Sequence, residues 1–280
     1  MGSPLPYYDE CASESDDIDP PGLQSPPAPL SAAKFAAANA NLSAPLSDAI
    51  SRAQSQSGSA ATGSPPVMLA FHPHGIFSMS FWLGGVASPQ LHAANPRVTF
   101  LISSFLHRLA PFCFILRWCG YAPADAATVA GLMRRGRDVA LLPGGFEEAT
   151  IYARGRHRVW LKRRRGFVKF ALRHGYALLP VYTFGEERNY ANVPGLLRLR
   201  LWLNRWQIPG VLPWGAPGLL PHSTHGMHTV FGAPLRLPRI AQPTLEDVRL
   251  WHGRYTQTLV ALFDRNKARF GQPDAQLEIW

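Results

Sequence analysis

The chain has 280 residues, of which 46% are hydrophobic, and it carries a formal net charge of +10 at pH 7. This length and hydrophobic content can bury one substantial core or two small ones, and a single domain is favoured. The three cysteines, Cys11, Cys113 and Cys119, are too few and too unevenly spaced for a disulfide framework, and none lies in a C-x-x-C zinc pattern.

Residues 1–66 differ in composition from the rest of the chain. They are rich in Ser, Pro and Ala, and their seven acidic and two basic residues give a net charge of −5, which leaves +15 for residues 67–280. Such a segment cannot bury enough apolar surface to offset its ordering entropy, so we expect it to be disordered, apart from a weak Ala-rich helix over 30–50. It lacks the long apolar stretch of a signal peptide. The folded domain is expected over 67–280.

A buried strand followed by a polar turn is predicted at the start of this domain. Val67–Phe71 are apolar, and His72-Pro73-His74-Gly75 follows them with a proline that marks a turn. Two imidazoles at a strand tip suggest acid/base chemistry, because histidine titrates close to neutrality. A turn whose histidines merely cap the strand fits the tetrapeptide equally well.

The next apolar stretch, from 98 to 121, is the nearest approach to a membrane span. His107, Arg108, Pro111 and Arg117 interrupt it, so it fits two short elements better than one long helix. Since no window of about 20 apolar, uncharged residues occurs anywhere in the chain, a transmembrane helix is not expected.

A second motif at a strand end follows. Val139–Leu142 are predicted to form a buried strand that ends at Pro143-Gly144-Gly145. The two glycines allow a turn with exposed backbone amides, which suits an anionic group or a developing oxyanion. Glu147 and Glu148 come directly after them. The alternative is an ordinary strand-to-helix turn with solvated glutamates.

A dense basic stretch comes next. It can bind phosphates, line an anionic membrane, grip nucleic acid or act as a nuclear signal, and alone it is most often a solvated face. Its members within twelve residues are Arg154, Arg156, Arg158, Lys162, Arg163, Arg164 and Arg165.

Residues 196–214 alternate Leu and Trp with Arg198, Arg200 and Arg205. Basic side chains that extend beside Leu and Trp are typical of an element lying in a membrane interface, and we expect one here. The alternative is a helix packed on the core with a solvated basic face.

Strand and helix signals alternate along the domain. The alternation predicts an α/β fold with a central mixed β-sheet flanked by helices. The expected elements are strands at 97–103, 177–184 and 229–231, and helices at 125–135 ended by Gly136, at 166–174 ended by Gly175, and from Thr244, with Asp247 in its capping box, to Gly271.

Taken in order, the motifs resemble those of the type-2 diacylglycerol/monoacylglycerol acyltransferases, within the glycerolipid acyltransferase superfamily. The resemblance covers about residues 67–270. The motifs are His72-Pro73-His74-Gly75, Gly144-Gly145-x-x-Glu148, Arg164-x-Gly166-Phe167-x-x-x-Ala171, Arg173-His174-Gly175, Pro180-x-x-x-Phe184-Gly185, Val230-Phe231-Gly232-Ala233-Pro234, and His252-x-x-Tyr255 with Leu262-Phe263-Asp264-x-x-Lys267.

The resemblance implies an enzyme at the cytosolic face of the endoplasmic reticulum membrane, or on lipid droplets, that moves a fatty acyl group from acyl-CoA to diacylglycerol and so makes triacylglycerol. Of the catalytic candidates His72 and His74, it implies His74 as the general base, with direct attack on the thioester. No acyl-enzyme is required, and no Gly-x-Ser-x-Gly elbow occurs to form one.

The other candidate residues take supporting roles under the same resemblance. The amides of Gly144 and Gly145, or a nearby Arg, would stabilise the oxyanion. Glu148 would orient the acceptor or an imidazole, with Glu147 as its rival. The phosphates of coenzyme A would meet Arg164, Arg165 and Lys169. Because the thiolate leaves readily, neither a cofactor nor a metal is implied.

Two departures limit this transfer. The superfamily motif resembles His-x4-Asp, but the fifth position after His74 is Met79. A carboxylate partner must therefore come from elsewhere. The type-2 family also usually has a membrane hairpin before this motif, where this chain has the polar segment 51–66. Either the sequence is an incomplete or naturally short form, or segments 98–121 and 196–214 alone hold the protein on the bilayer.

Several alternatives stay open at the level of sequence. The acceptor could be monoacylglycerol or a fatty alcohol, which would make the product diacylglycerol or a wax ester. A hypothesis from another functional class is that the chain is a catalytically silent protein that docks on lipid surfaces. A nucleic-acid binder rests only on the pI of about 10.0 and the arginine run, without interleaved aromatics or a known motif, so no nucleic acid is expected. The oligomeric state is open.

Overall fold

The computed structural model describes residues 66–280, except 111, 194, 207, 209, 216, 217, 219 and 223–225. The disorder and the weak helix expected in residues 1–65 therefore lie outside the described residues.

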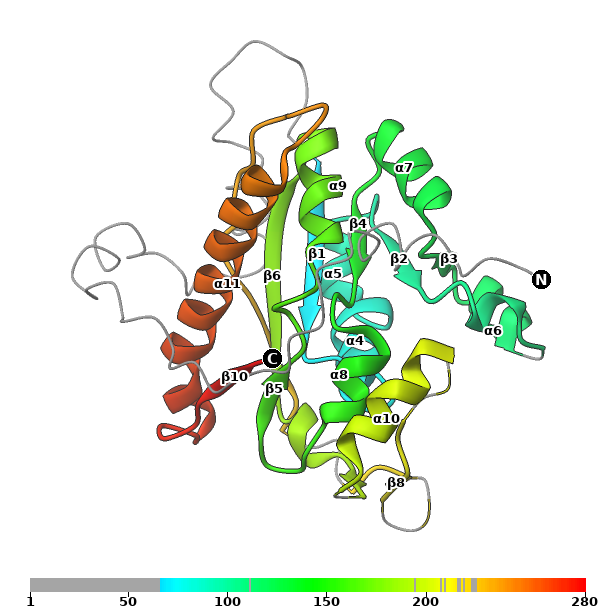
Figure 1. The fold of residues 1–280 in the computed structure, drawn as a ribbon, viewed down its shortest axis with the longest axis vertical. Coiled ribbons are helices and arrows are strands. Elements are labelled where there is room, and N and C mark those ends of the chain that lie inside the picture. Colours follow the sequence, from blue (N-terminus) through cyan, green and yellow to red (C-terminus); the bar gives the residue numbers. More distant parts are fainter. Residues whose placement is uncertain are drawn as a thin grey trace.

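A mixed six-stranded sheet forms the centre of the molecule (Figure 1), as the alternation of elements predicted. Neighbouring strands are parallel except at one edge, where β9 runs antiparallel to β6. The strand order is β3 (Ala122–Pro123), β2 (Thr99–Ile102), β4 (Val139–Leu141), β1 (Val67–His72), β6 (Ala177–Phe184) and β9 (His228–Phe231).

Helices cover both faces of this sheet, and each face has its own apolar cluster. The first cluster lies under α7 (Ala126–Arg134), α9 (Gly166–His174) and α11 (Leu245–Lys267). The second lies under α4 (Met79–Phe81), the π-helical turn Trp82–Val86, α5 (Pro89–Ala94) and α6 (Phe112–Trp118).

Side chains of β1 alternate between these two faces, as a fully buried strand requires. Met68 and Ala70 join the cluster under α11, whereas Val67, Leu69 and Phe71 join the other. By the same period of two, His72 points to the α11 side. The strand thus extends one residue beyond the predicted Val67–Phe71 and takes the first histidine into the core.

Shorter elements complete the end of the molecule toward which the β1 arrow points in Figure 1. Their bounds are α8 (Gly145–Ile151), β5 (His157–Val159), β7 (Ala191–Asn192), α10 (Leu197–Leu203), β8 (Pro213–Trp214), β10 (Leu277–Ile279) and the 3-10 turns Leu106–Arg108, Glu186–Arg188, Asn204–Trp206 and Ala268–Phe270. Strand β10 pairs with β5 in parallel, and β7 pairs with β8 antiparallel.

Helices begin and end close to the residues that capping and glycine signals in the sequence predicted. The Thr244 side chain and Asp247 form the predicted capping box at the start of α11. Gly136 and Gly175 adopt φ values of 64° and 70° after α7 and α9, where a left-handed residue ends a helix. The last helix differs slightly, because α11 ends at Lys267 and a 3-10 turn carries the chain on to Gly271.

The stretch 98–121 divides into β2, a 3-10 turn and α6, so it is not one span, as predicted. Within the described part of the chain, no helix has both the length and the apolar content to cross a bilayer.

Candidate active site

Three parallel strands bring the sequence motifs to one edge of the sheet. The motif His72-Pro73-His74-Gly75 ends β1, Pro143-Gly144-Gly145 follows β4, and Gly185-Glu186 follows β6. Because β4 and β6 flank β1 in parallel, their carboxyl ends meet at the same edge, where open α/β sheets bind ligands. The two strand-end motifs singled out in the sequence therefore lie together.

The Glu148 carboxylate joins three segments at this edge. One oxygen, Oε1, accepts a hydrogen bond from the backbone N–H of His74, and Oε2 accepts one from the N–H of Trp160 at 2.7 Å. Glu148 is only 2% exposed, so it is not the solvated glutamate of the alternative interpretation. Burial raises its pKa to about 7, against the opposing effect of these two hydrogen bonds. Glu148 thus contacts His74 through the backbone N–H.

The position of the Glu148 carboxylate requires a glycine at residue 144. A Cβ atom on residue 144 would lie 1.9 Å from Oε2 of Glu148, well inside contact distance. The next residue, Gly145, has φ of 58° and begins α8. Its amide is among the first N–H groups of a helix, which have no carbonyl partner within the helix. Both predicted glycines thus lie beside the buried glutamate at the sheet edge.

The His74 imidazole is held in one tautomer by the backbone. Its Nδ1 lies 2.9 Å from the Gly75 carbonyl oxygen. Since a carbonyl can only accept, Nδ1 carries the proton and Nε2 keeps its lone pair. The Ser78 hydroxyl lies 3.4 Å from Nε2, at the outer limit of a hydrogen bond. The residue as a whole is part-exposed, and the lone pair lies on Nε2.

Burial lowers the pKa of His74 below its ordinary value, whereas the Gly75 hydrogen bond and the charge of Glu147 raise it and the charge of Arg164 lowers it. The imidazole is therefore neutral, the form a general base needs, at neutral pH. In place of a carboxylate five residues after His74, a backbone carbonyl contacts the ring, and Glu147 contributes negative charge nearby.

Glu147 and Arg164 form an ion pair beside His74. The pair is part-buried, with 28% and 16% of the two side chains exposed. The predicted basic group is thus divided: Arg164 pairs with Glu147, Arg165 directly precedes α9, and Lys169 lies in that helix.

Other arginines of the predicted basic stretch lie elsewhere. Arg158 and Arg156 contact Glu278 of β10 at 2.9 and 3.4 Å, so they tie the β5 and β10 strands together and do not approach His74.

His72 differs sharply from His74. It is completely buried, its Nε2 lies 3.0 Å from the Tyr255 hydroxyl of α11, and burial lowers its pKa to about 3. A neutral imidazole in this position links β1 to α11. The structure therefore gives the two predicted catalytic histidines different surroundings: His72 is buried and His74 is part-exposed.

Sequence reasoning missed the backbone groups that contact His74 and Glu148. The Gly75 carbonyl and the Trp160 amide are backbone groups, which no pattern of residue types reveals. Glu186 was also missed, although it directly follows the quoted Phe184-Gly185; its carboxylate accepts a hydrogen bond from the N–H of Ser80 at 2.7 Å. A charged residue next to a glycine at a strand end was the available signal.

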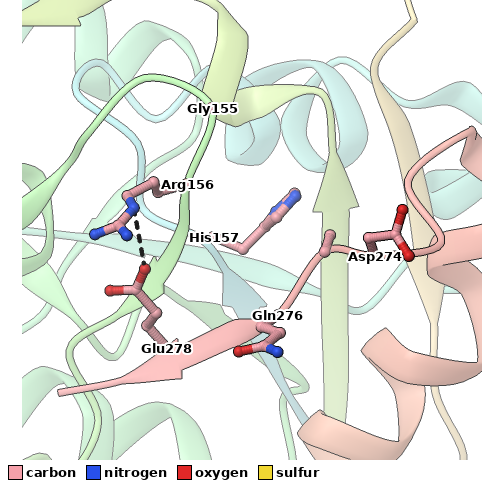
Figure 2. Close-up of a pocket in the computed structure, with 7 residues that line it drawn as sticks. Gly155, Arg156, His157, Asp274, Gln276 and Glu278 are labelled. Atoms are coloured by element: carbon pink, nitrogen blue, oxygen red, sulfur yellow. Dashed lines mark ion pairs between the residues drawn. The ribbon is translucent and has the colours of Figure 1, made fainter.

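A cavity of about 270 Å³ lies beside β5 and β10 (Figure 2). It contains none of the predicted site residues. Gly155, Arg156, His157, Asp274, Ala275, Gln276 and Glu278 line it. Among the residues that the structure describes, no group of three or more His, Cys, Asp or Glu side chains is arranged to hold a metal ion.

Comparisons with known proteins agree with the motif order. A family model described as diacylglycerol acyltransferase matches residues 66–280. The chain is 30% identical over 233 residues to diacylglycerol O-acyltransferase 2 of Bos taurus, an alignment that covers 75% of this chain and 63% of the relative. The Homo sapiens protein of the same name matches at 30% identity over 233 residues, covering 75% and 59%.

A third relative is diacylglycerol O-acyltransferase 2-like protein 6 of Homo sapiens, which is 30% identical over 232 residues, with 75% of this chain and 68% of the relative covered. The chain therefore spans only 63% and 59% of the length of the first two relatives. No solved structure matches the chain.

Proposed function

The chain belongs to the diacylglycerol acyltransferase family, and from this we propose that it moves a fatty acyl group from acyl-CoA to the hydroxyl of diacylglycerol, forming triacylglycerol. The names of its relatives suggest the reaction and the acceptor. The single observation that best supports the proposal is the part-exposed His74 at the carboxyl edge of the sheet, whose Nδ1–H bond to the Gly75 carbonyl leaves the lone pair on Nε2.

In the proposed reaction, Nε2 of His74 accepts the proton of the acceptor hydroxyl as its oxygen attacks the thioester carbonyl. The imidazolium that forms is stabilised by the Nδ1–H bond to Gly75 and by the negative charge of Glu147. General-base assistance of this type is worth about 10² to 10⁴ in rate. No acyl-enzyme forms on this route.

The tetrahedral intermediate carries its negative charge on the former carbonyl oxygen. We assign the backbone amides of Gly144 and Gly145 as its donors, because they lie at the start of α8 next to Glu148, with a nearby arginine as the alternative. When the intermediate collapses, the C–S bond breaks, and the proton on His74 passes to the thiolate of coenzyme A. No cofactor takes part.

Binding of the coenzyme A phosphates is assigned to the start of α9. Arg165 and Lys169 lie there, and Arg164 adjoins them while it contacts Glu147. Guanidinium and ammonium groups bind phosphate well, the former in a bidentate manner. Because Arg164 pairs with Glu147, it also has the role of setting the charge beside His74.

We also propose that the protein docks on a membrane surface, at the cytosolic face of the endoplasmic reticulum or on lipid droplets. None of the residues of α10 is buried, and large apolar side chains are exposed there and on α6. These include Phe114 (68% exposed), Trp118 (88%) and Trp206 (67%). Figure 1 places α6 and α10 on the same side of the molecule. Exposed apolar residues gathered in this way mark an interaction surface.

Basic side chains accompany this apolar surface. Arg198 and Arg205 of the α10 segment are exposed, which suits anionic lipid headgroups. Arg200 does not fit the expectation that Arg198, Arg200 and Arg205 all lie in the membrane interface. Its guanidinium donates to the carbonyl oxygens of Gly210 and Thr150, at 2.6 and 2.9 Å, and fastens α10 to α8.

The proposed activity is tested by expressing the protein in a host deficient in triacylglycerol and assaying its membranes with labelled acyl-CoA. Diacylglycerol, monoacylglycerol and a long-chain alcohol are offered separately as acceptors. We expect labelled triacylglycerol as the main product. Preference for another acceptor would correct the substrate, whereas no product with any acceptor, from well-expressed protein, would favour a silent lipid-surface protein.

A further inference from the structure

Glu186 is a buried acid that the proposed reaction does not use. It directly follows Gly185 at the end of β6 and begins a 3-10 turn. Its side chain is completely buried, and among the described residues no lysine, arginine or histidine forms a salt bridge with it. A buried acid without a basic partner requires another explanation.

The contacts of Glu186 converge on the turn that contains His74. Its Oε2 accepts a hydrogen bond from the N–H of Ser80 at 2.7 Å, and the carboxyl also accepts one from the N–H of Met79. The Ser80 hydroxyl in turn donates to the carbonyl oxygen of Pro73 at 3.0 Å. Glu186 thus holds the far end of the turn, and Ser80 closes the turn back onto its beginning.

The second oxygen of Glu186 faces Gly75. Oε1 has no hydrogen-bond partner among the described residues, and a Cβ atom on residue 75 would lie 1.9 Å from it. Gly75 has φ of 64°. The carboxyl therefore occupies the space that any other residue would need at position 75, and it fixes the peptide whose carbonyl oxygen accepts the Nδ1–H of His74.

We infer that Glu186 is a positioning residue for acyl transfer: through Ser80 and Gly75 it holds the turn that keeps the proton of His74 on Nδ1 and the lone pair on Nε2. The expected effect of Glu186 on the rate of acyl transfer rests on the proposed function. Its effect on the tautomer of His74 does not. Glu148 fixes the turn from the α8 side, and Glu186 fixes it from the β6 side.

The protonation of Glu186 supports this role. Burial raises the pKa of its carboxyl to about 8, and hydrogen bonds from Ser80 and Met79 partly oppose this. At neutral pH the group is therefore largely neutral, and it can hold the turn without placing a net charge in the core. A glutamine, which is neutral and of similar shape, should replace it well.

The kinetic test compares three substitutions. Glu186→Gln should keep kcat within about threefold of wild type, whereas Glu186→Ala should lower kcat by about 10²-fold with little change in KM for acyl-CoA, because a small displacement of a catalytic group costs this much. Glu187→Ala is the matched control. Glu187 is 2% exposed and lies in the same turn, but its partners are Gly185, Arg188, Gln272 and His157.

The second measurement reads the tautomer of His74 directly and needs no turnover. Protein labelled with ¹⁵N-histidine is compared by NMR as wild type and as Glu186→Ala, and the His74 signals are identified by their loss in His74→Gln. We expect the Nδ1–H tautomer in the wild type and a mixture in Glu186→Ala. This result can be obtained even if the acyltransferase assay fails.

A substitution on the other side of the contact guards against misfolding of Glu186→Ala. Gly75→Ala should push the Glu186 carboxyl away and lower kcat by about 10²-fold. Its control, Gly271→Ala, has a similar φ of 73° with nothing within 4 Å of the added Cβ. An unchanged His74 tautomer in Glu186→Ala, or equal losses of kcat in Glu186→Ala and Glu187→Ala at matched melting temperatures, would overturn the inference.

Discussion

Replacing His74 by Ala is expected to lower kcat for acyl transfer by about 10²- to 10⁴-fold, the usual worth of a general base. His74 is part-exposed at this edge, and its Nδ1–H bond to the Gly75 carbonyl leaves the lone pair on Nε2. The backbone N–H of residue 74 remains in the variant, so its hydrogen bond to Glu148 can persist. Folding and membrane association should therefore be almost unchanged.

Initial rates, melting temperature and flotation with vesicles measure these three properties in one preparation. The control is His92→Ala, which removes an exposed imidazole of α5 whose Nε2 contacts the Val86 carbonyl. It should keep normal turnover. Near-normal turnover in His74→Ala would show that another group is the base, and a large fall in melting temperature would show that the residue is chiefly structural.

Placing Asp at both Trp202 and Trp206 is expected to abolish binding of the protein to vesicles that contain anionic lipid. The two indoles are 48% and 67% exposed and their rings contact each other at the end of α10. If each indole buries about 100 Å² in the lipid interface, its loss weakens binding by about 2.5 kcal/mol, which is close to 10²-fold. Two such losses should leave little bound protein.

Sedimentation with vesicles of phosphatidylcholine and phosphatidylserine measures this binding. Leu250→Asp is the control, because Leu250 is 53% exposed on α11, which lies away from α6 and α10 in Figure 1. It should bind as the wild type does. Equal binding by all three proteins would remove α10 from the docking surface, and a loss in both variants would indicate that added negative charge alone prevents docking.

Much of the fold followed from local patterns. The strands β1, β4 and β6 are short apolar runs that end at Pro or Gly, and α11 has its capping box, so periodicity and turn chemistry were sufficient to place them. Because neighbouring parallel strands bring their carboxyl ends to one edge, the motif order also placed His74 near Gly144 and Glu148. Chain order and strand direction were therefore sufficient to predict this part of the site.

The partners of His74 could not be predicted in the same way. The Gly75 carbonyl that accepts from His74 and the Trp160 N–H that donates to Glu148 belong to the main chain, and the second contact depends on how separate segments fold together. Pairing of Arg164 with Glu147 joins residues seventeen positions apart, with strand β5 between them. Residue type reports which groups can ionise, but the backbone contacts that set tautomer and pKa are formed only in the tertiary structure.

The two histidines illustrate the same limit. The tetrapeptide presented them as a pair, yet the period of two in β1 points His72 into the core beside Tyr255, while His74 follows the strand and remains accessible. Extending the strand by one residue would have separated their roles. Strand ends are the least certain feature of a sequence-based prediction, and here the uncertain residue is one of the two candidates.

A rapid-quench experiment tests direct transfer to the acceptor most directly. Membranes containing the protein are mixed with labelled acyl-CoA, with or without diacylglycerol, quenched within one turnover, and separated into lipid and protein fractions. We expect labelled triacylglycerol only when both substrates are present, and no label on the protein at any time. Label that first appears on the protein and then passes to diacylglycerol, or the absence of labelled triacylglycerol from well-expressed protein, would contradict the proposed reaction.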